Sequence, residues 1–185
     1  HRDLHSFPTR RSSDLTQLKL IGDSTSGTTT RRLAENSELY PHFLRLMDKT
    51  SIKFIHTIRN PFDPIFIMMV RGKKTFDQAF FHYEQGCRRL EKLYQQVGAE
   101  NIFSIRYEDF VTYPGKHLNL LAEFLGLSKE PGYIEACTRV LDRSPQKIRT
   151  GIDWQKEWIN KVNQLIQQTP FLNGYSFEEL TENLD

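Results

Sequence analysis

The sequence has few cysteines, no long apolar run and no strong excess of one charge, and each shortage excludes a class of protein. Its two cysteines, Cys87 and Cys137, form no Cys-x-x-Cys pair, which argues against a metal site and against thiol redox chemistry. The longest apolar run, residues 65–70, is far shorter than the about 20 residues that a membrane helix needs. With 25 basic and 23 acidic residues, the net charge of +2 predicts no general attraction to nucleic acid or to an anionic membrane.

The Gly-Lys-Ser/Thr loop of P-loop kinases is also missing. The chain has 185 residues, of which 38% are hydrophobic and 12% aromatic. This length and composition suffice for one domain with a substantial core. Strand patterns alternate with helical patterns, so we expect an α/β fold with three layers, α/β/α, and a parallel sheet covered on both faces. The expected strands are residues 17–22, 51–58 and 101–107, and the expected helices are residues 28–35, 37–48 (capped by Ser37), 62–70, 74–97, 116–124, 131–141 and 154–168.

A short, largely apolar run, residues 51–58, stops at Arg59, which is followed by Asn60-Pro61. This pattern predicts a buried parallel strand that ends in a tight turn, with a helix just beyond. Open α/β folds bind ligands at the carboxyl ends of such strands, and a guanidinium suits a phosphate because it donates two parallel hydrogen bonds. Arg59 is therefore a candidate phosphate ligand. The alternative is that Arg59 simply pairs with Asp63 on the first turn of the next helix.

A second strand ends in Tyr107-Glu108-Asp109, and a later helix closes on residues 124–127, Phe-Leu-Gly-Leu. In this order and spacing, the three motifs resemble those of the sulfotransferases that use 3'-phosphoadenosine 5'-phosphosulfate (PAPS) as co-substrate. The resemblance implies a fold like that of P-loop nucleoside-triphosphate hydrolases, incomplete at the N-terminus of this chain. It also implies that Arg59 grips the 3'-phosphate of PAPS and that Tyr107 lies beside the adenine.

The same resemblance extends to a late basic loop, in which Lys147 and Arg149 match residues that close over the 3'-phosphate. A solvated basic loop is the alternative for both residues. The family works without a metal ion, so we expect none here. Because sulfuryl transfer resembles phosphoryl transfer, catalysis should consist mainly of positioning and fixed positive charge, with a base for the acceptor group.

The candidate catalytic residues are Asp23 and Ser24, which follow the first expected strand. They match a bacterial branch of the family that has Gly-Asp-Lys-Lys at this place, and Asp23 is the best acid–base candidate. The lysine of the family is missing here, since Ser24 and Thr25 carry no charge. A further departure is Ile67, where the family usually has Ser or Thr as a second ligand of the 3'-phosphate.

His56 tempts as a general base, but it stands inside a strand, where a core histidine is the more common arrangement. The prediction is a sulfotransferase fragment that moves a sulfuryl group from PAPS to a hydroxyl or amine of a small-molecule or glycan acceptor. The alternative is a non-catalytic relative that retains at most nucleotide binding. Because the chain lacks the loop with which the family holds the 5'-phosphosulfate, we expect little or no transfer by the chain as it stands.

The first fifteen residues show neither helical nor strand periodicity. They resemble translated sequencing-adapter peptides, so we expect residues 1–15 to be a non-native tail and residues 16–185 to be a partial sulfotransferase domain. The true N-terminus would then be missing. The compartment is accordingly left open, with the cytoplasm as the default, and the sequence does not indicate an oligomeric state.

Overall fold

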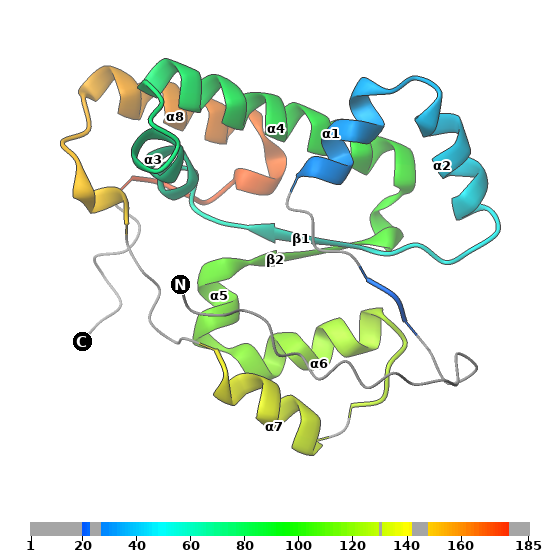
Figure 1. The fold of residues 1–185 in the computed structure, drawn as a ribbon. Helices are drawn as coiled ribbons and strands as arrows, with labels where there is room; N and C mark the ends of the chain where they lie inside the picture. The colour runs from blue at the N-terminus through cyan, green and yellow to red at the C-terminus, as the bar shows by residue number, and fades with distance from the viewer. Residues whose placement is uncertain (1–19, 23–26, 130, 142–147, 178–185) are drawn as a thin grey trace.

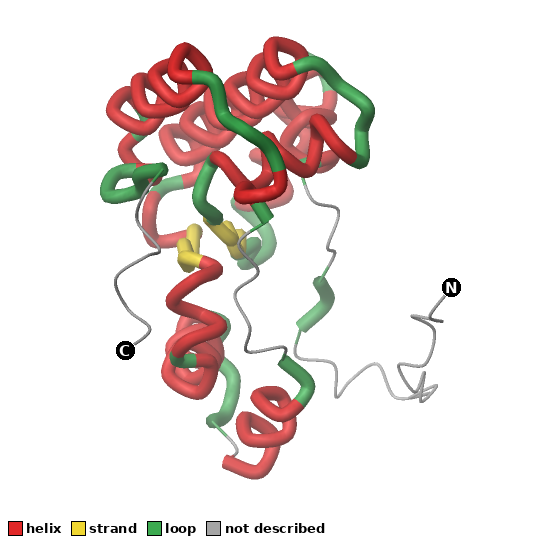
Figure 2. Tube along the Cα trace, turned by 90° about the vertical axis from the view of Figure 1, so that its left-hand side faces the viewer, coloured by secondary structure: helices red, strands yellow, loops and turns green. Residues whose placement is uncertain are grey.

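The computed structural model describes residues 20–22, 27–129, 131–141 and 148–177, and in them a small parallel sheet lies between two layers of helices (Figures 1 and 2). Strand β1 (Phe54–Ile58) pairs with β2 (Ile102–Arg106) in parallel, from Phe54 opposite Ile102 to Ile58 opposite Arg106. The α/β class, the parallel sheet and its cover on both faces were predicted correctly from the sequence.

Helices cover both faces of this sheet (Figure 1). The first layer contains α1 (Thr28–Glu35), α2 (Leu39–Met47), α3 (Phe62–Val70), α4 (Phe76–Val97) and α8 (Lys156–Gln168). The second contains α5 (Tyr107–Thr112), α6 (Pro114–Phe124) and α7 (Pro131–Arg139). Short 3-10 turns occupy Ala99–Asn101, Arg149–Gly151 and Pro170–Leu172.

Helix α4 is the longest described helix, and its ends follow from local chemistry. Thr75 caps the N-terminus: its side chain accepts from the Gln78 N–H, and the Gln78 side chain accepts from the Thr75 N–H. Gly98 ends the helix at a φ of 80°, a conformation that glycine adopts without steric cost. One face of α4 packs on the core, with Phe76 and Cys87 buried.

The main core lies between α3, α4 and α8. Phe62, Ile65, Val162 and Leu172 are fully buried there. The ring of Phe62 also meets Trp154 edge-on, with ring centroids 5.1 Å apart. This packing fixes the first turn of α3 and therefore the end of β1 that precedes it.

Three local expectations were wrong. Residues 20–22 of the expected first strand carry no strand structure, and residues 17–19 lie outside the described residues. Ser37 does not cap α2, because the helix begins two residues later and the Asn36 side chain accepts from the N–H groups of Glu38 and Leu39. Tyr107 is the first residue of α5 and does not end a strand. The pairing of β2 stops at Arg106, which lies opposite Ile58, the last residue of β1.

His56 is half-buried within β1 and packs against neighbouring side chains. Its Nδ1 lies 2.8 Å from the Tyr94 hydroxyl, and its ring meets Phe171 edge-on. Burial lowers the pKa of His56 from 6.5 to about 4, so the ring is neutral at pH 7.

Within the described ranges, no helix combines the length and the apolarity needed to cross a membrane.

Candidate functional site

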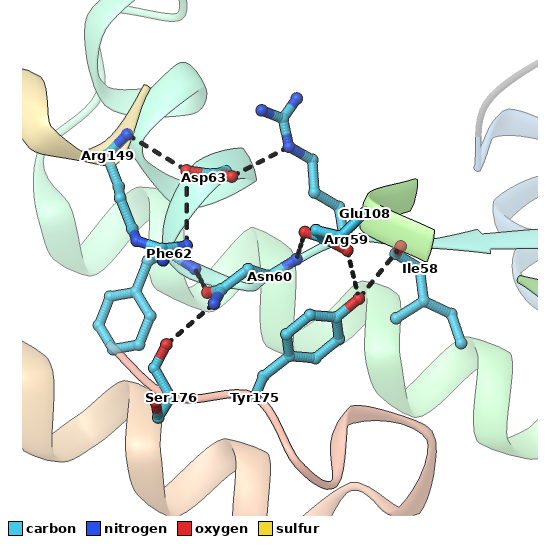
Figure 3. Close-up of polar contacts among 9 residues, drawn as sticks. All are labelled: Ile58, Arg59, Asn60, Phe62, Asp63, Glu108, Arg149, Tyr175 and Ser176. Atoms are coloured by element: carbon cyan, nitrogen blue, oxygen red, sulfur yellow. Dashed lines mark hydrogen bonds and ion pairs between the residues drawn. The ribbon is translucent and has the colours of Figure 1, made fainter. Parts of the chain in front are cut away.

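The turn from β1 to α3 is held by the side chain of Asn60, which is almost fully buried. The Asn60 Oδ1 accepts from the Phe62 N–H at 3.2 Å, and its Nδ2 donates to the Ser176 carbonyl at 2.9 Å. The Asn60 N–H itself donates to Glu108 Oε1 at 3.0 Å (Figure 3). The backbone next to Arg59 is therefore fixed by contacts to three separate segments.

Glu108, on the first turn of α5, joins this turn to the end of the described chain. Its Oε2 accepts from the Tyr175 hydroxyl at 2.7 Å, and that hydroxyl lies 3.4 Å from the Ile58 carbonyl (Figure 3). Burial is the main cause that raises the pKa of Tyr175, and its hydrogen bond to Glu108 adds to the shift, so the phenol stays protonated and donates. The Arg106 guanidinium lies 4.5 Å from the centre of the Tyr175 ring.

Arg59 leaves β1 and lies between Asp63 and Tyr107. Its Nε is 3.0 Å from Asp63 Oδ2, and its guanidinium carbon is 4.8 Å from the centroid of the Tyr107 ring. Its side chain is 25% exposed, and the outer end of the guanidinium points away from Asp63 (Figure 3). The pairing of Arg59 with Asp63 therefore exists. It leaves Arg59 beside Tyr107, the residue that the family resemblance assigned to the same ligand.

Arg149 reaches Asp63 from the other side. Its backbone N–H donates to Asp63 Oδ1 at 3.2 Å, and its Nη1 lies 4.0 Å from the same oxygen. The Arg149 side chain is only 4% exposed, and its Nη1 is buried with no hydrogen-bond partner among the described residues. The alternative of a solvated loop was therefore wrong for Arg149. The 3-10 turn carries its side chain inward, and the Arg149 carbonyl accepts from Trp154 Nε1 at 2.7 Å.

The structure brings Arg59, Tyr107 and Arg149 into one cluster around Asp63. The other predicted site residues, Asp23, Ser24 and Lys147, lie outside the described residues. Ile67 occupies the second turn of α3, where its half-buried hydrocarbon side chain offers no hydrogen-bond donor.

Sequence reasoning missed the shared role of Asp63 and the contacts of Glu108 with Tyr175. The Asn-Pro-x-Asp sequence that starts α3 signals a local pairing with Arg59. Nothing local signals that Arg149, far along the chain, reaches the second oxygen of the same carboxylate.

A cavity of about 280 Å³ lies away from this cluster, between α1, α2 and α4. Leu33, Tyr40 and Arg89 are among its lining residues, and none of the predicted site residues lines it. The part of the chain that the structure describes contains no group of three or more His, Cys, Asp or Glu side chains placed to hold a metal ion.

Residues 26–131, more than half of the chain, match the sequence profile of a sulfotransferase family. The chain belongs to the sulfotransferase family. The matched span contains Arg59 and Tyr107 but ends before Arg149. No curated protein matches this chain significantly.

Two solved structures similar to this chain are sulfotransferase domains. One comes from the olefin synthase of Synechococcus PCC 7002, with 22% identity and a TM-score of 0.49, covering 63% of this chain and 48% of that domain. The other comes from the curacin biosynthetic pathway, with 18% identity and a TM-score of 0.46, covering 63% of this chain and 52% of that domain. The chain thus spans about half the length of each.

Proposed function

We propose that this sulfotransferase uses PAPS and moves its sulfuryl group to a hydroxyl or amine of a small-molecule or glycan acceptor. One observation carries the proposal: Arg59 and Arg149, far apart in the sequence, meet at the carboxylate of Asp63 beside the ring of Tyr107. Two guanidiniums at one carboxylate, one of them against an aromatic ring, suit a ligand that joins a phosphate to a flat base.

The buried end of Arg149 supports an anionic ligand in particular. A polar group buried without a hydrogen-bond partner costs free energy, and a charged group costs more. Asp63 supplies one negative charge for two guanidiniums, so the cluster keeps a net positive charge. A 3'-phosphate would add negative charge and acceptor oxygens there. Arg59 and Arg149 would hold this phosphate, and Tyr107 would border the adenine.

When bound, PAPS supplies the activated sulfuryl group, and the chain supplies position and charge. Arg59 and Arg149 orient the nucleotide through a phosphate that takes no part in the reaction. Asp23 is the proposed acid–base group for the acceptor, Ser24 a proposed hydrogen-bond donor, and Lys147 a further cation near the 3'-phosphate. Fixed charges of this kind stabilise a transition state because they need no reorganisation during the reaction.

A second candidate function is nucleotide binding without sulfuryl transfer. Ile67 favours it, because this residue cannot donate a hydrogen bond to the 3'-phosphate. A missing hydrogen bond to a charged group costs about 1.5–3 kcal/mol, or roughly tenfold to a hundredfold in affinity. The absence of a lysine at Ser24 and Thr25 points the same way for the transfer step.

The proposal is tested by calorimetry with adenosine 3',5'-bisphosphate, the nucleotide that remains after transfer. We expect Arg59→Ala to weaken binding at least tenfold, because it removes a charge-assisted contact to phosphate. Arg88→Ala is the matched control, since Arg88 is 66% exposed and pairs with Glu84 on the surface of α4. Equal affinity of the Arg59→Ala variant and the unchanged chain rejects the site.

A transfer assay with labelled PAPS and a panel of hydroxyl and amine acceptors separates the two functions. Nucleotide binding with sulfated product supports the transferase, and binding without any product supports the second candidate.

A further inference from the structure

Asp63 is a buried carboxylate that serves two arginines with separate oxygens. Its side chain is 2% exposed; Oδ2 lies 3.0 Å from Arg59 Nε, and Oδ1 accepts from the Arg149 N–H at 3.2 Å. The Arg149 Nη1 lies 4.0 Å from Oδ1 (Figure 3). A single side chain thus connects the β1–α3 turn to the 3-10 turn at Arg149–Gly151.

We propose that Asp63 is the positioning residue that holds Arg59 and Arg149 in place as one site for the 3'-phosphate. This inference rests on the proposed function. It adds a residue that would not touch the nucleotide and would act only through the two guanidiniums.

Charge alone argues against a carboxylate at this place. A negative group close to a bound phosphate repels it, and the repulsion is strong where water is largely excluded. Two guanidiniums in one buried site also repel each other, and a carboxylate between them removes most of that cost. Asp63 therefore opposes the ligand through its charge and favours it through the geometry that it imposes.

Asp63 and Tyr107 together fix the orientation of the Arg59 guanidinium. Asp63 takes the Nε edge of the guanidinium and the Tyr107 ring takes one face, so the group is held from two sides. The outer end of the guanidinium is thereby directed away from Asp63 (Figure 3). A long side chain held in this way loses less rotamer freedom when the phosphate binds.

Substitution of Asp63 by asparagine separates the two effects, because it keeps the shape and removes the charge. If Asp63 only adds negative charge, Asp63→Asn binds adenosine 3',5'-bisphosphate more tightly than the unchanged chain. If Asp63 positions the arginines, Asp63→Asn binds it at least tenfold more weakly. The two readings thus differ in the sign of the effect.

Adenosine 5'-monophosphate, which lacks the 3'-phosphate, provides a readout that a general loss of structure would not give. We expect Asp63→Asn to lose most of the preference for the bisphosphate and to keep its affinity for the monophosphate. A loss of affinity for both nucleotides by the same factor overturns the inference, as does tighter binding of the bisphosphate.

Asp77→Asn is the matched control, since Asp77 is 77% exposed and pairs with Lys161 on the surface. Circular dichroism establishes that each variant folds. Asp63→Glu keeps the charge but displaces it, and it supplies a second measurement of the preference if Asp63→Asn does not fold. If neither variant folds, Asp63 belongs to the fold alone and the inference is wrong.

The two proposals fail in different ways. An unchanged chain that binds both nucleotides equally well refutes the phosphate site, and the role of Asp63 with it. An unchanged chain that prefers the bisphosphate, together with an Asp63→Asn variant that prefers it equally, refutes only the positioning role.

Discussion

The hydroxyl of Tyr175 should contribute measurably to stability, because it closes the contact between the last described segment and the ends of both strands. It donates to Glu108 at 2.7 Å, while Glu108 also accepts from the Asn60 N–H at 3.0 Å. Tyr175→Phe removes one hydrogen bond to a half-buried carboxylate and leaves the Asn60 contact in place. A bond of this type contributes about 1.5–3 kcal/mol.

For a chain of this size, a loss of 1 kcal/mol lowers the melting temperature by about 2–4 °C, so Tyr175→Phe should melt about 3–12 °C lower. Thermal unfolding followed by circular dichroism measures this shift, and urea unfolding gives the free energy. Tyr113→Phe is the matched control, since the Tyr113 side chain lies at the surface, where the residue is 61% exposed. The reasoning fails if the two variants melt within 1 °C of each other.

A double-mutant cycle sharpens the test by asking whether the loss belongs to the Tyr175–Glu108 pair. Glu108→Gln should destabilise on its own, because it removes the charge that strengthens both bonds. The two substitutions together should cost less than the sum of their separate effects. Strict additivity would mean that the hydroxyl contributes through another contact.

The other predictions concern pH and packing. His56 has a folded pKa of about 4 against 6.5 when unfolded, so the unfolded chain takes up the proton first as the pH falls. The stability present above pH 6.5 should therefore decrease by about 3 kcal/mol between pH 6.5 and pH 4, and urea unfolding of the unchanged chain against His56→Gln at several pH values measures it. Gly151→Ala should destabilise by about 1–3 kcal/mol, because the added methyl would lie 2.7 Å from Phe66 Cζ and the ring would have to move. Thermal melting should show this loss but none for Gly132→Ala, where nothing lies within 4 Å, and calorimetry should show weaker nucleotide binding because Gly151 ends the turn that carries Arg149.

The parts of the fold that could be predicted from sequence are those whose signals are local. Helices α1 and α3 have the predicted bounds, and α4 ends at residue 97 as predicted, since periodicity and a terminating glycine lie within one segment. The prediction of Ser37 as the cap of α2 was wrong because Asn36 and Ser37 are both plausible caps. Only the observed start of the helix decides between them.

The candidate site also contains residues that local signals predict and residues that only long-range contacts place. Arg59 and Tyr107 follow strands, and the register of a parallel pair brings them to one edge of the sheet. The burial of Arg149 and its approach to Asp63 depend on a long-range contact between α3 and a 3-10 turn, for which no periodic pattern exists. The roles of Asp23, Ser24 and Lys147 remain predictions.

The contacts of Tyr175 and Ser176 also bear on how the protein is made. These residues lie 67 to 117 positions after their partners Ile58, Asn60 and Glu108. During synthesis both strands leave the ribosome long before residue 176 does, so the turn that carries Arg59 lacks the two hydrogen bonds from this segment until then. A nascent chain should therefore acquire its full affinity for the nucleotide only after residue 176 has left the ribosome.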